Sequence, residues 1–87
     1  MAEQSVTLEQ IRDLLVDHLG CEPAAVTPEA RLAGDLGCDS LDVLELVIAA
    51  EVRWSIEISD DEVPEVEDTT VATLLALLSA KVEASHG

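Results

Sequence analysis

The middle of the chain, residues 40–54, reads SLDVLELVIAAEVRW. At about 100° per residue, this stretch predicts a helix from near Ser40 to about Trp54 that is apolar on two nearly opposite sides. The first side is an ordinary core stripe made of Val43, Leu46, Val47, Ala50 and Trp54. The second side consists of Leu41, Leu44, Ile48 and Val52, with Glu45 and Glu51 beside it.

The second apolar side needs an explanation, because a small domain can hardly surround one of its own helices. We therefore expect this side to be exposed, and exposed apolar patches commonly mark interaction sites. The alternative is that a third helix or a long loop covers Leu41 and Leu44.

The residues before this stretch predict one helix and a long connection. Thr7 and Gln10 stand in a capping-box pattern at the start of the helix, and Gly20 is placed to end it. Residues 20–39 contain several Pro and Gly residues, which interrupt regular secondary structure, and are therefore predicted to form the connection. Three apolar residues are expected to hold the connection against the core: Val26, Leu32 and Leu36.

Two further helices are expected after the central one. A short acidic third helix is predicted near Asp60 to Val63, where Pro64 limits it. A fourth starts near Thr69 or Thr70. Its apolar stripe, at helical spacing, is Val71, Leu74, Leu75, Leu78 and Val82.

The fold class that follows is all-α. Eighty-seven residues leave room for one core, so residues 1–87 are expected to form a single domain. The architecture is a small four-helix bundle with three longer helices, one short third helix and a long loop between the first two. Residues 1–5 and 84–87 are expected to be flexible tails.

The charge is strongly acidic and restricts the partners. Four Lys and Arg against 19 Asp and Glu give a net charge of −15, which excludes nucleic acid and anionic membrane surfaces as partners. Asp39, Asp42 and Glu45 recur every third residue along one edge of the central helix. A basic protein surface would be steered there by charge and held by Leu44 and Ile48.

The sequence also bears on location. No apolar run is long enough to cross a bilayer, and residues 1–4 lack the basic start of a signal peptide. We expect a cytoplasmic protein, a monomer, with Cys21 and Cys38 as reduced thiols. Two cysteines without neighbouring His residues predict no metal site.

Residues 35–42, DLGCDSLD, resemble the phosphopantetheine attachment motif of acyl carrier proteins, whose core is Asp-Ser-Leu after a Leu-Gly turn. Residues 42–51 resemble the recognition helix of that family, and residues 63–71 resemble its approach to the last helix. The resemblance covers roughly residues 6–83, and it rests on a motif at a helix start in an acidic four-helix chain.

The resemblance implies a function without catalysis. A phosphopantetheinyl transferase would attach phosphopantetheine from coenzyme A to Ser40. The arm would carry acyl groups as thioesters between enzymes of fatty acid synthesis, such as acyl transferases and ketosynthases with basic docking patches. Ser40 is interpreted as the helix N-cap, and Gly37 as the residue that permits a tight turn before it. The implied partner-binding residues are Asp39, Leu41, Asp42, Leu44, Glu45, Ile48 and Glu51.

The resemblance also implies that an acyl chain can enter the helical core. The matching positions are Leu46, Val47, Ala50, Val66 and Leu75. An aliphatic core can open for a flexible chain because both are hydrocarbon. Trp54 either closes the far end of this space or is simple core packing. Cys38 is interpreted as a small apolar loop residue, and the alternative is a disulfide with the arm under oxidation.

Other functions stay open. Within carriers, a polyketide or specialised lipid pathway is the runner-up. An acidic helical interaction module without a prosthetic group would share the fold and differ only at Ser40. An enzyme is disfavoured, because His18 and His86 are the only histidines and both are far from Ser40 in the sequence. Asp60-Asp61-Glu62 lacks the alternating ligands of a calcium-binding loop.

Overall fold

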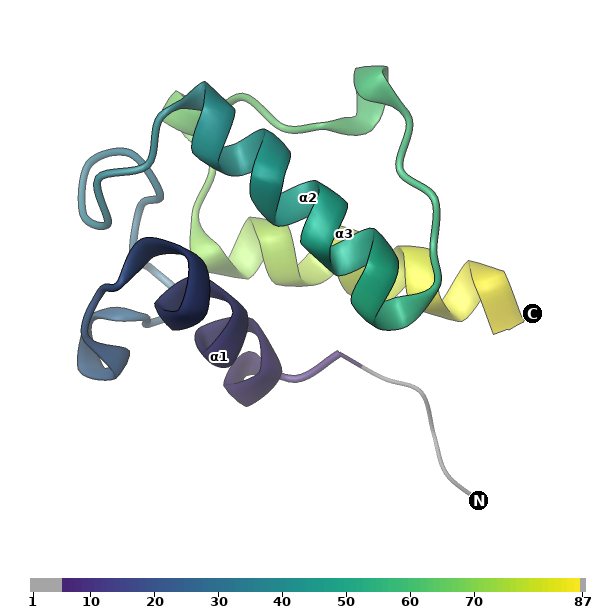
Figure 1. Ribbon diagram of the computed structural model, residues 1–87, viewed down its shortest axis with the longest axis horizontal. Helices are drawn as coiled ribbons and strands as arrows, with labels where there is room; N and C mark the ends of the chain where they lie inside the picture. The colour runs from purple at the N-terminus through teal and green to yellow at the C-terminus, as the bar shows by residue number, and fades with distance from the viewer. Residues whose placement is uncertain (1–5, 87) are drawn as a thin grey trace.

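The computed structural model describes residues 6–86, and its regular elements are three α-helices and three short 3-10 turns (Figure 1). The α-helices are α1 (Leu8–Leu19), α2 (Ser40–Trp54) and α3 (Val71–His86). The 3-10 turns are η1 (Pro23–Ala25), η2 (Asp60–Glu62) and η3 (Val66–Asp68). Over residues 6–86 the only β-type pairing is one isolated bridge between Arg31 and Thr70. The all-α prediction is confirmed.

The predicted ends of the first helix are confirmed. The backbone N–H of Gln10 donates to Thr7 Oγ1 at 3.2 Å, and the backbone N–H of Thr7 donates to Gln10 Oε1 at 3.0 Å. This reciprocal pair provides hydrogen-bond acceptors for two backbone N–H groups that have no partner within the helix. At the other end, Gly20 adopts a φ of +71° and donates to the carbonyl of Val16. That conformation favours glycine, which explains why α1 ends there.

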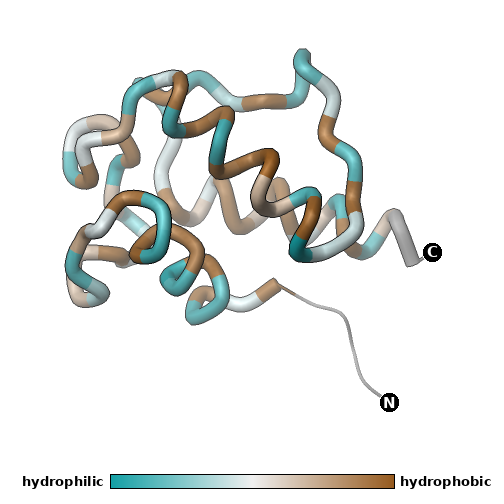
Figure 2. Tube along the Cα trace, viewed as in Figure 1, coloured by the Kyte–Doolittle hydropathy of each residue, from teal (hydrophilic) through white to brown (hydrophobic). Residues whose placement is uncertain are grey.

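One hydrophobic core joins the three helices. The core stripe predicted for α2 is buried at every position: Val43, Leu46, Val47, Ala50 and Trp54. Ile11 and Leu15 of α1 are fully buried in the same cluster, as are Leu74 and Leu78 of α3. Figure 2 shows hydrophobic residues recurring along each helix at the spacing that turns one side inward.

The long connection at residues 20–39 is ordered by hydrogen bonds to two helices. Arg12 of α1 donates to the carbonyls of Pro23 and Val26, each at 3.0 Å. The backbone N–H of Leu32 donates to the carbonyl of Thr69 at 3.0 Å, beside the start of α3. Val26 and Leu32 are completely buried, as predicted, and Leu36 is half-buried against the core.

The predicted end of the last helix is wrong, whereas the short third helix expected near Asp60 to Val63 is present as the 3-10 turn η2, with η3 following as a second turn. Pro64 lies between them and cannot donate a backbone hydrogen bond, so an α-helix cannot run through this segment. The helix α3 continues through His86, although residues 84–86 were assigned to a tail, because no breaker precedes Gly87. Residues 1–5 and 87, the rest of the expected tails, lie outside the described residues.

Within the described part of the chain, no helix has both the length and the apolar character that a membrane span requires.

Candidate functional site

Ser40 is the first residue of α2, and the residue that caps the helix is Asp39. The backbone N–H of Asp42 donates to Asp39 Oδ1 at 2.8 Å, and the backbone N–H of Asp39 donates to Asp42 Oδ2 at 3.1 Å. The interpretation of Ser40 as the N-cap is therefore wrong. Two carboxylates make the capping bonds, so the exposed Ser40 side chain is left out of them.

The turn that precedes Ser40 is fixed by its own hydrogen bonds. Gly37 has a φ of +75°, which confirms that a residue without a side chain permits the tight turn. The backbone N–H of Gly37 donates to Ala33, and that of Cys38 donates to Leu32 at 2.8 Å. These bonds tie the turn to the buried Leu32, so Ser40 is presented from a positioned loop.

Cys38 lies two residues before Ser40 and is buried. Burial is the main cause that raises the pKa of its thiol from 9.0 to about 11, and the nearby Asp42 carboxylate adds to the effect. The thiolate is the reactive form of cysteine, so a thiol with this pKa stays protonated and inert near neutral pH. This supports the interpretation of Cys38 as an apolar loop residue rather than a disulfide partner of the arm.

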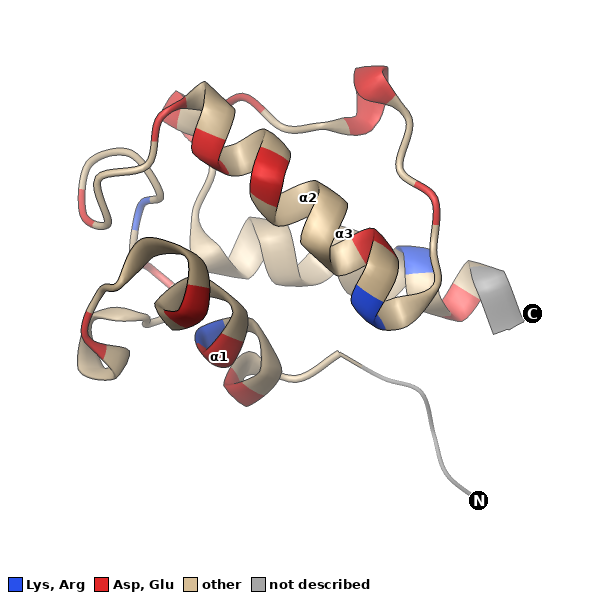
Figure 3. Cartoon of the chain, viewed as in Figure 1, with Lys and Arg blue, Asp and Glu red and all other residues tan. Residues whose placement is uncertain are grey.

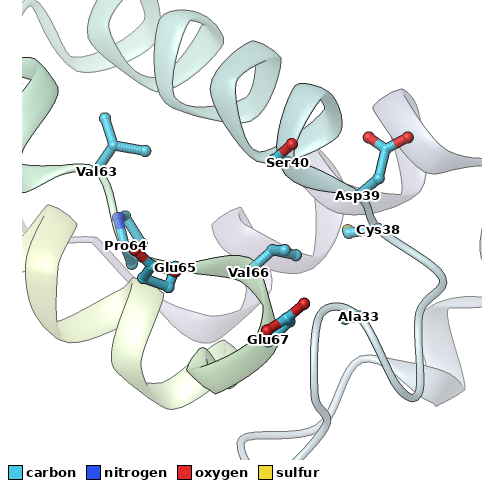
Figure 4. Close-up of a pocket in the computed structure, with 9 residues that line it drawn as sticks. All are labelled: Ala33, Cys38, Asp39, Ser40, Val63, Pro64, Glu65, Val66 and Glu67. Carbon is cyan, nitrogen blue, oxygen red and sulfur yellow. The ribbon is translucent and has the colours of Figure 1, made fainter.

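Ser40 lies at the boundary of two surface pockets. The larger pocket has a volume of about 530 Å³ and separates α2 from η3 (Figure 4). It is lined by Ala33, Cys38, Asp39, Ser40, Val63, Pro64, Glu65, Val66 and Glu67. The smaller pocket, of about 470 Å³, is lined by Ser40, Leu41, Leu44, Asp60 and Val63. A group attached to Ser40 therefore has apolar surface on either side of it.

The second apolar side of α2 is exposed. Its four members form the apolar stripe: Leu41 is 60% exposed, Leu44 41%, Ile48 51% and Val52 78%. The alternative that a loop or a third helix covers Leu41 and Leu44 is wrong. The stripe starts next to Ser40 and runs the length of α2.

The acidic residues along α2 have different roles in the structure (Figure 3). Glu45 is exposed on the edge of the apolar stripe. Asp39 and the half-buried Asp42 are engaged in the capping box. Glu51 accepts a hydrogen bond of 2.8 Å from the backbone N–H of Ile58. Among these four carboxylates, Asp39 and Glu45 are the exposed ones, and Glu45 lies directly beside the apolar stripe.

The segment between α2 and α3, residues 55–70, is anchored by contacts that the sequence did not predict; we call it the strap. Near the start of the strap, the backbone N–H of Ile58 donates a hydrogen bond to the Glu51 carboxylate of α2. Lys81 of α3 holds its middle through an ion pair with Glu62, with 2.5 Å between Nζ and Oε2. The hydroxyl of Thr69 donates to the carbonyl of Glu65 near its end. No local sequence signal could have indicated the pair of Glu62 and Lys81, because its two members come from different elements.

The Glu62–Lys81 ion pair predicts a specific pH dependence of stability. Hydrogen bonding from Lys81 first, and then from Ser59, lowers the pKa of the Glu62 carboxyl from 4.5 to about 2. A carboxyl whose pKa is lower in the folded state stabilises the fold above its unfolded pKa and loses that effect as it is protonated. The parent should therefore be more stable than Glu62→Gln near neutral pH, and the difference should shrink from pH 4.5 to about 2.

Urea unfolding across this pH range measures the difference. The control is the same substitution in a Lys81→Gln background, where Glu62→Gln should have a smaller effect, because the partner of the pair is already absent. An equal effect of Glu62→Gln in both backgrounds would contradict the assignment.

The five residues expected to receive an acyl chain do not line one common pocket. Val66 lines the larger pocket beside Ser40 and is half-buried against the core. The others are part of the core cluster or pack against it: Leu46, Val47, Ala50 and Leu75. Val66 is therefore the member that connects the surface near Ser40 with the core.

The described residues contain no group of three or more His, Cys, Asp or Glu side chains arranged to hold a metal ion. His18 is exposed in the last turn of α1.

Comparison with known proteins assigns this site to a class. Residues 9–78 match the family model described as "Phosphopantetheine attachment site". The class is therefore that of carrier domains to which phosphopantetheine is attached. These residues include the exposed Ser40, both pockets and all of α2.

Curated relatives narrow the class further. An acyl carrier protein from Solidesulfovibrio magneticus is 41% identical over 59 residues, which are 68% of this chain and 76% of the relative. Another, from Zymomonas mobilis, is 47% identical over 62 residues, covering 71% and 80%. A third, from Thermosynechococcus vestitus, is 40% identical over 81 residues, covering 93% and 98%. The chain belongs to the acyl carrier protein family.

Proposed function

We propose that this protein carries acyl intermediates of fatty acid synthesis as thioesters on a phosphopantetheine arm attached to Ser40. The observation that carries the proposal is the position of Ser40. It is exposed at the first residue of α2, the cap of the helix is supplied by Asp39, and pockets of about 530 and 470 Å³ adjoin it.

The residues around Ser40 suit such an arm. Its hydroxyl can be approached by a transferase that delivers phosphopantetheine from coenzyme A, because Ser40 is exposed at the surface. Once bound, the arm supplies the thiol that holds the acyl group. The protein positions the arm and is assigned no catalytic step of its own.

The apolar stripe is the proposed docking surface for the enzymes that load and unload the arm. A basic patch on such an enzyme is attracted by the net charge of −15 and by Glu45, and its apolar residues pack on Leu44 and Ile48. The proposed partners are a phosphopantetheinyl transferase, acyl transferases and ketosynthases. The carrier is proposed to be a cytoplasmic monomer, and its free Cys21 and Cys38 agree with a reducing compartment.

The cargo is proposed to enter the bundle at the larger pocket. An acyl chain held on the arm would pass Val66 on its way to the apolar interior, to which Leu46, Val47 and Ala50 of α2 belong. Leu75 of α3 packs against the same core. Both cargo and interior are aliphatic, so the exchange of contacts has a modest free-energy cost.

Loading by a promiscuous phosphopantetheinyl transferase tests the function directly. The protein is incubated with coenzyme A and the transferase, and its intact mass is then measured. A gain of one phosphopantetheine arm is expected. The absence of any gain would contradict the carrier function and favour an acidic interaction module with the same fold.

Reversing the charge of Glu45 should weaken docking while leaving the fold intact. Glu45→Lys places a positive charge at the edge of the apolar stripe, where a basic patch of a ketosynthase is expected to approach. Stability should change by less than about 0.5 kcal/mol, as is usual at exposed positions. Binding of the loaded carrier to the ketosynthase, measured by titration calorimetry at low salt, reports the effect.

The matched control is Glu57→Lys, which makes the same charge change at an exposed position of the strap. It should reduce the affinity less than Glu45→Lys. If the two variants lost the same affinity for the ketosynthase, binding would depend only on the net charge, and Glu45 would not be part of the docking surface.

A further inference from the structure

We infer that an enzyme that docks on the apolar stripe places an acidic side chain opposite Arg53, so that Arg53 selects partners by a charge of the opposite sign to Glu45. The inference rests on the proposed docking surface. It adds the chemistry of the partner group that this surface requires at its far end from Ser40.

Arg53 is the one basic residue of α2. It lies in the last turn of the helix and is exposed. At about 100° per residue, it falls on the same side of the apolar stripe as Asp42 and Glu45. Figure 3 shows acidic positions from the start of α2 and a basic position near its C-terminal end. The edge of the stripe that begins with acids therefore ends with a cation.

The other three basic residues of the chain lie elsewhere. Arg12 donates its hydrogen bonds to loop carbonyls, and Arg31 belongs to the connection before α2. Lys81 is paired with Glu62. Among the residues that the structure describes, none forms an ion pair or a side-chain hydrogen bond with Arg53. Its charge is thus available to a partner.

Trp54 prepares Arg53 to bind a carboxylate. The guanidinium lies over the ring of Trp54, 5.5 Å from its centroid, and Trp54 itself belongs to the core. Stacking on an aromatic face leaves the N–H groups at the edge of the guanidinium open, and these match the two oxygens of a carboxylate. A side chain that is already positioned loses less conformational entropy on binding. The fitting partner group is therefore the side chain of Asp or Glu.

A partner that covers the whole apolar stripe cannot avoid Arg53. Val52, the member of the stripe next to it, is 78% exposed, the largest fraction of the four. An enzyme surface that buries Val52 comes close to Arg53 and removes water from its guanidinium. A charge that loses water without meeting an opposite charge weakens binding, so such a surface needs an acid at this place.

The charge of Arg53 acts locally, although the chain as a whole is strongly acidic. Arg53 follows Glu45 by eight positions, which corresponds to about 12 Å along the helix. Exposed charges are screened over about 8 Å at physiological ionic strength. A distant partner therefore responds to the net charge of −15, whereas a docked partner responds to each end of α2 separately.

Arg53→Glu separates these two effects, because they predict opposite signs. If only net charge mattered, the more acidic variant would bind a basic enzyme more tightly. We expect weaker binding instead, by severalfold to about tenfold, because an attraction is replaced by a repulsion. Arg53→Gln should lose less affinity than Arg53→Glu, and Arg53→Lys should retain most of it.

The test uses the full-length carrier and a ketosynthase from the same organism. The carrier is loaded with phosphopantetheine, loading is confirmed by intact mass, and affinity is measured by titration calorimetry at low salt. Thermal unfolding of each variant confirms that it is folded at the assay temperature. If Arg53→Glu is not, Arg53→Gln decides the question. The matched control is Arg31→Glu, which makes the same charge change at an exposed position of the connection and should bind at least as tightly as the parent.

Cross-linking with a carbodiimide identifies the partner group directly. The reagent activates a carboxylate, and a neighbouring amine then displaces the resulting urea to form an amide bond. In the complex of Arg53→Lys with the ketosynthase, peptide mass spectrometry should find position 53 joined to an Asp or Glu of the enzyme. The matched variant Arg31→Lys should give no such link at position 31.

Unchanged or tighter binding of Arg53→Glu would overturn the inference, and so would an equal loss of affinity in Arg31→Glu or the absence of any link from position 53. These outcomes differ from a failure of the proposed function. A carrier that does not accept the arm would overturn that function, and a loaded parent that does not bind the ketosynthase would overturn the docking surface together with this inference.

Discussion

Ser40→Ala is expected to abolish loading with phosphopantetheine completely, while the stability of the protein stays almost the same. The loss is total because the substitution removes the only oxygen at this position that can form the phosphodiester. The small change in stability follows from the structure, in which Asp39 and Asp42 make the capping bonds of α2. Intact mass after incubation with coenzyme A and the transferase measures the first effect, and urea unfolding measures the second.

Asp39→Ala, unlike Ser40→Ala, should lower the stability of the protein. It removes the acceptor for the backbone N–H of Asp42 and should cost about 0.5–2 kcal/mol, which is typical of a lost N-cap. Ser59→Ala is the control for loading, since it removes an exposed hydroxyl from the strap and should leave the mass gain intact. If Ser40→Ala destabilised the protein as much as Asp39→Ala, the assignment of the cap would be wrong.

The distinction between Ser40 and Asp39 shows the limit of prediction at this helix start. Asp and Ser are both favoured N-cap residues, and they are neighbours here. The sequence located the start of the helix to within one residue, but not the register of the cap. The register is settled by Asp42, which completes a reciprocal pair with Asp39 and would not do so with Ser40.

The long helices could be predicted because their signals are periodic and local. The two sides of α2 are separated in the structure as the spacing of Leu44 and Leu46 indicated. The strap could not be predicted in the same way. Its short 3-10 turns carry no periodicity, and its anchors, such as Glu62 with Lys81, join residues distant in the sequence. The bridge between Arg31 and Thr70 is likewise a tertiary contact.

The same distinction applies to the candidate site. Ser40 and the apolar stripe are properties of one helix and its preceding turn, so the sequence could indicate them. The larger pocket depends on how Val63 and Glu67 of the strap are placed relative to α2, which only the folded chain defines. Glu51 illustrates the consequence, because its hydrogen bond with the backbone N–H of Ile58 depends on the placement of the strap.

The second large effect is expected from a pair of substitutions on opposite sides of α2. Leu46 is 1% exposed within the core, and Leu46→Ala should lower the free energy of unfolding by about 2–5 kcal/mol, because it removes buried methyl groups and leaves a cavity. A domain of this size responds to each kcal/mol with a shift of roughly 4–8 °C in Tm. Thermal unfolding followed by circular dichroism should therefore show that Tm falls by at least about 8 °C.

Leu44→Ala makes the same chemical change two residues away and should give the opposite result. Leu44 is 41% exposed in the apolar stripe, so its truncation creates no enclosed cavity and should cost less than about 1 kcal/mol. It should instead weaken binding of the loaded carrier to a ketosynthase, since apolar contacts hold the docked complex. Should Leu46→Ala fail to fold, Leu46→Met, which nearly conserves the volume, keeps the comparison measurable. A loss of stability from Leu44→Ala as large as that from Leu46→Ala would mean that this side of the helix is internal, and the docking surface would have to lie elsewhere.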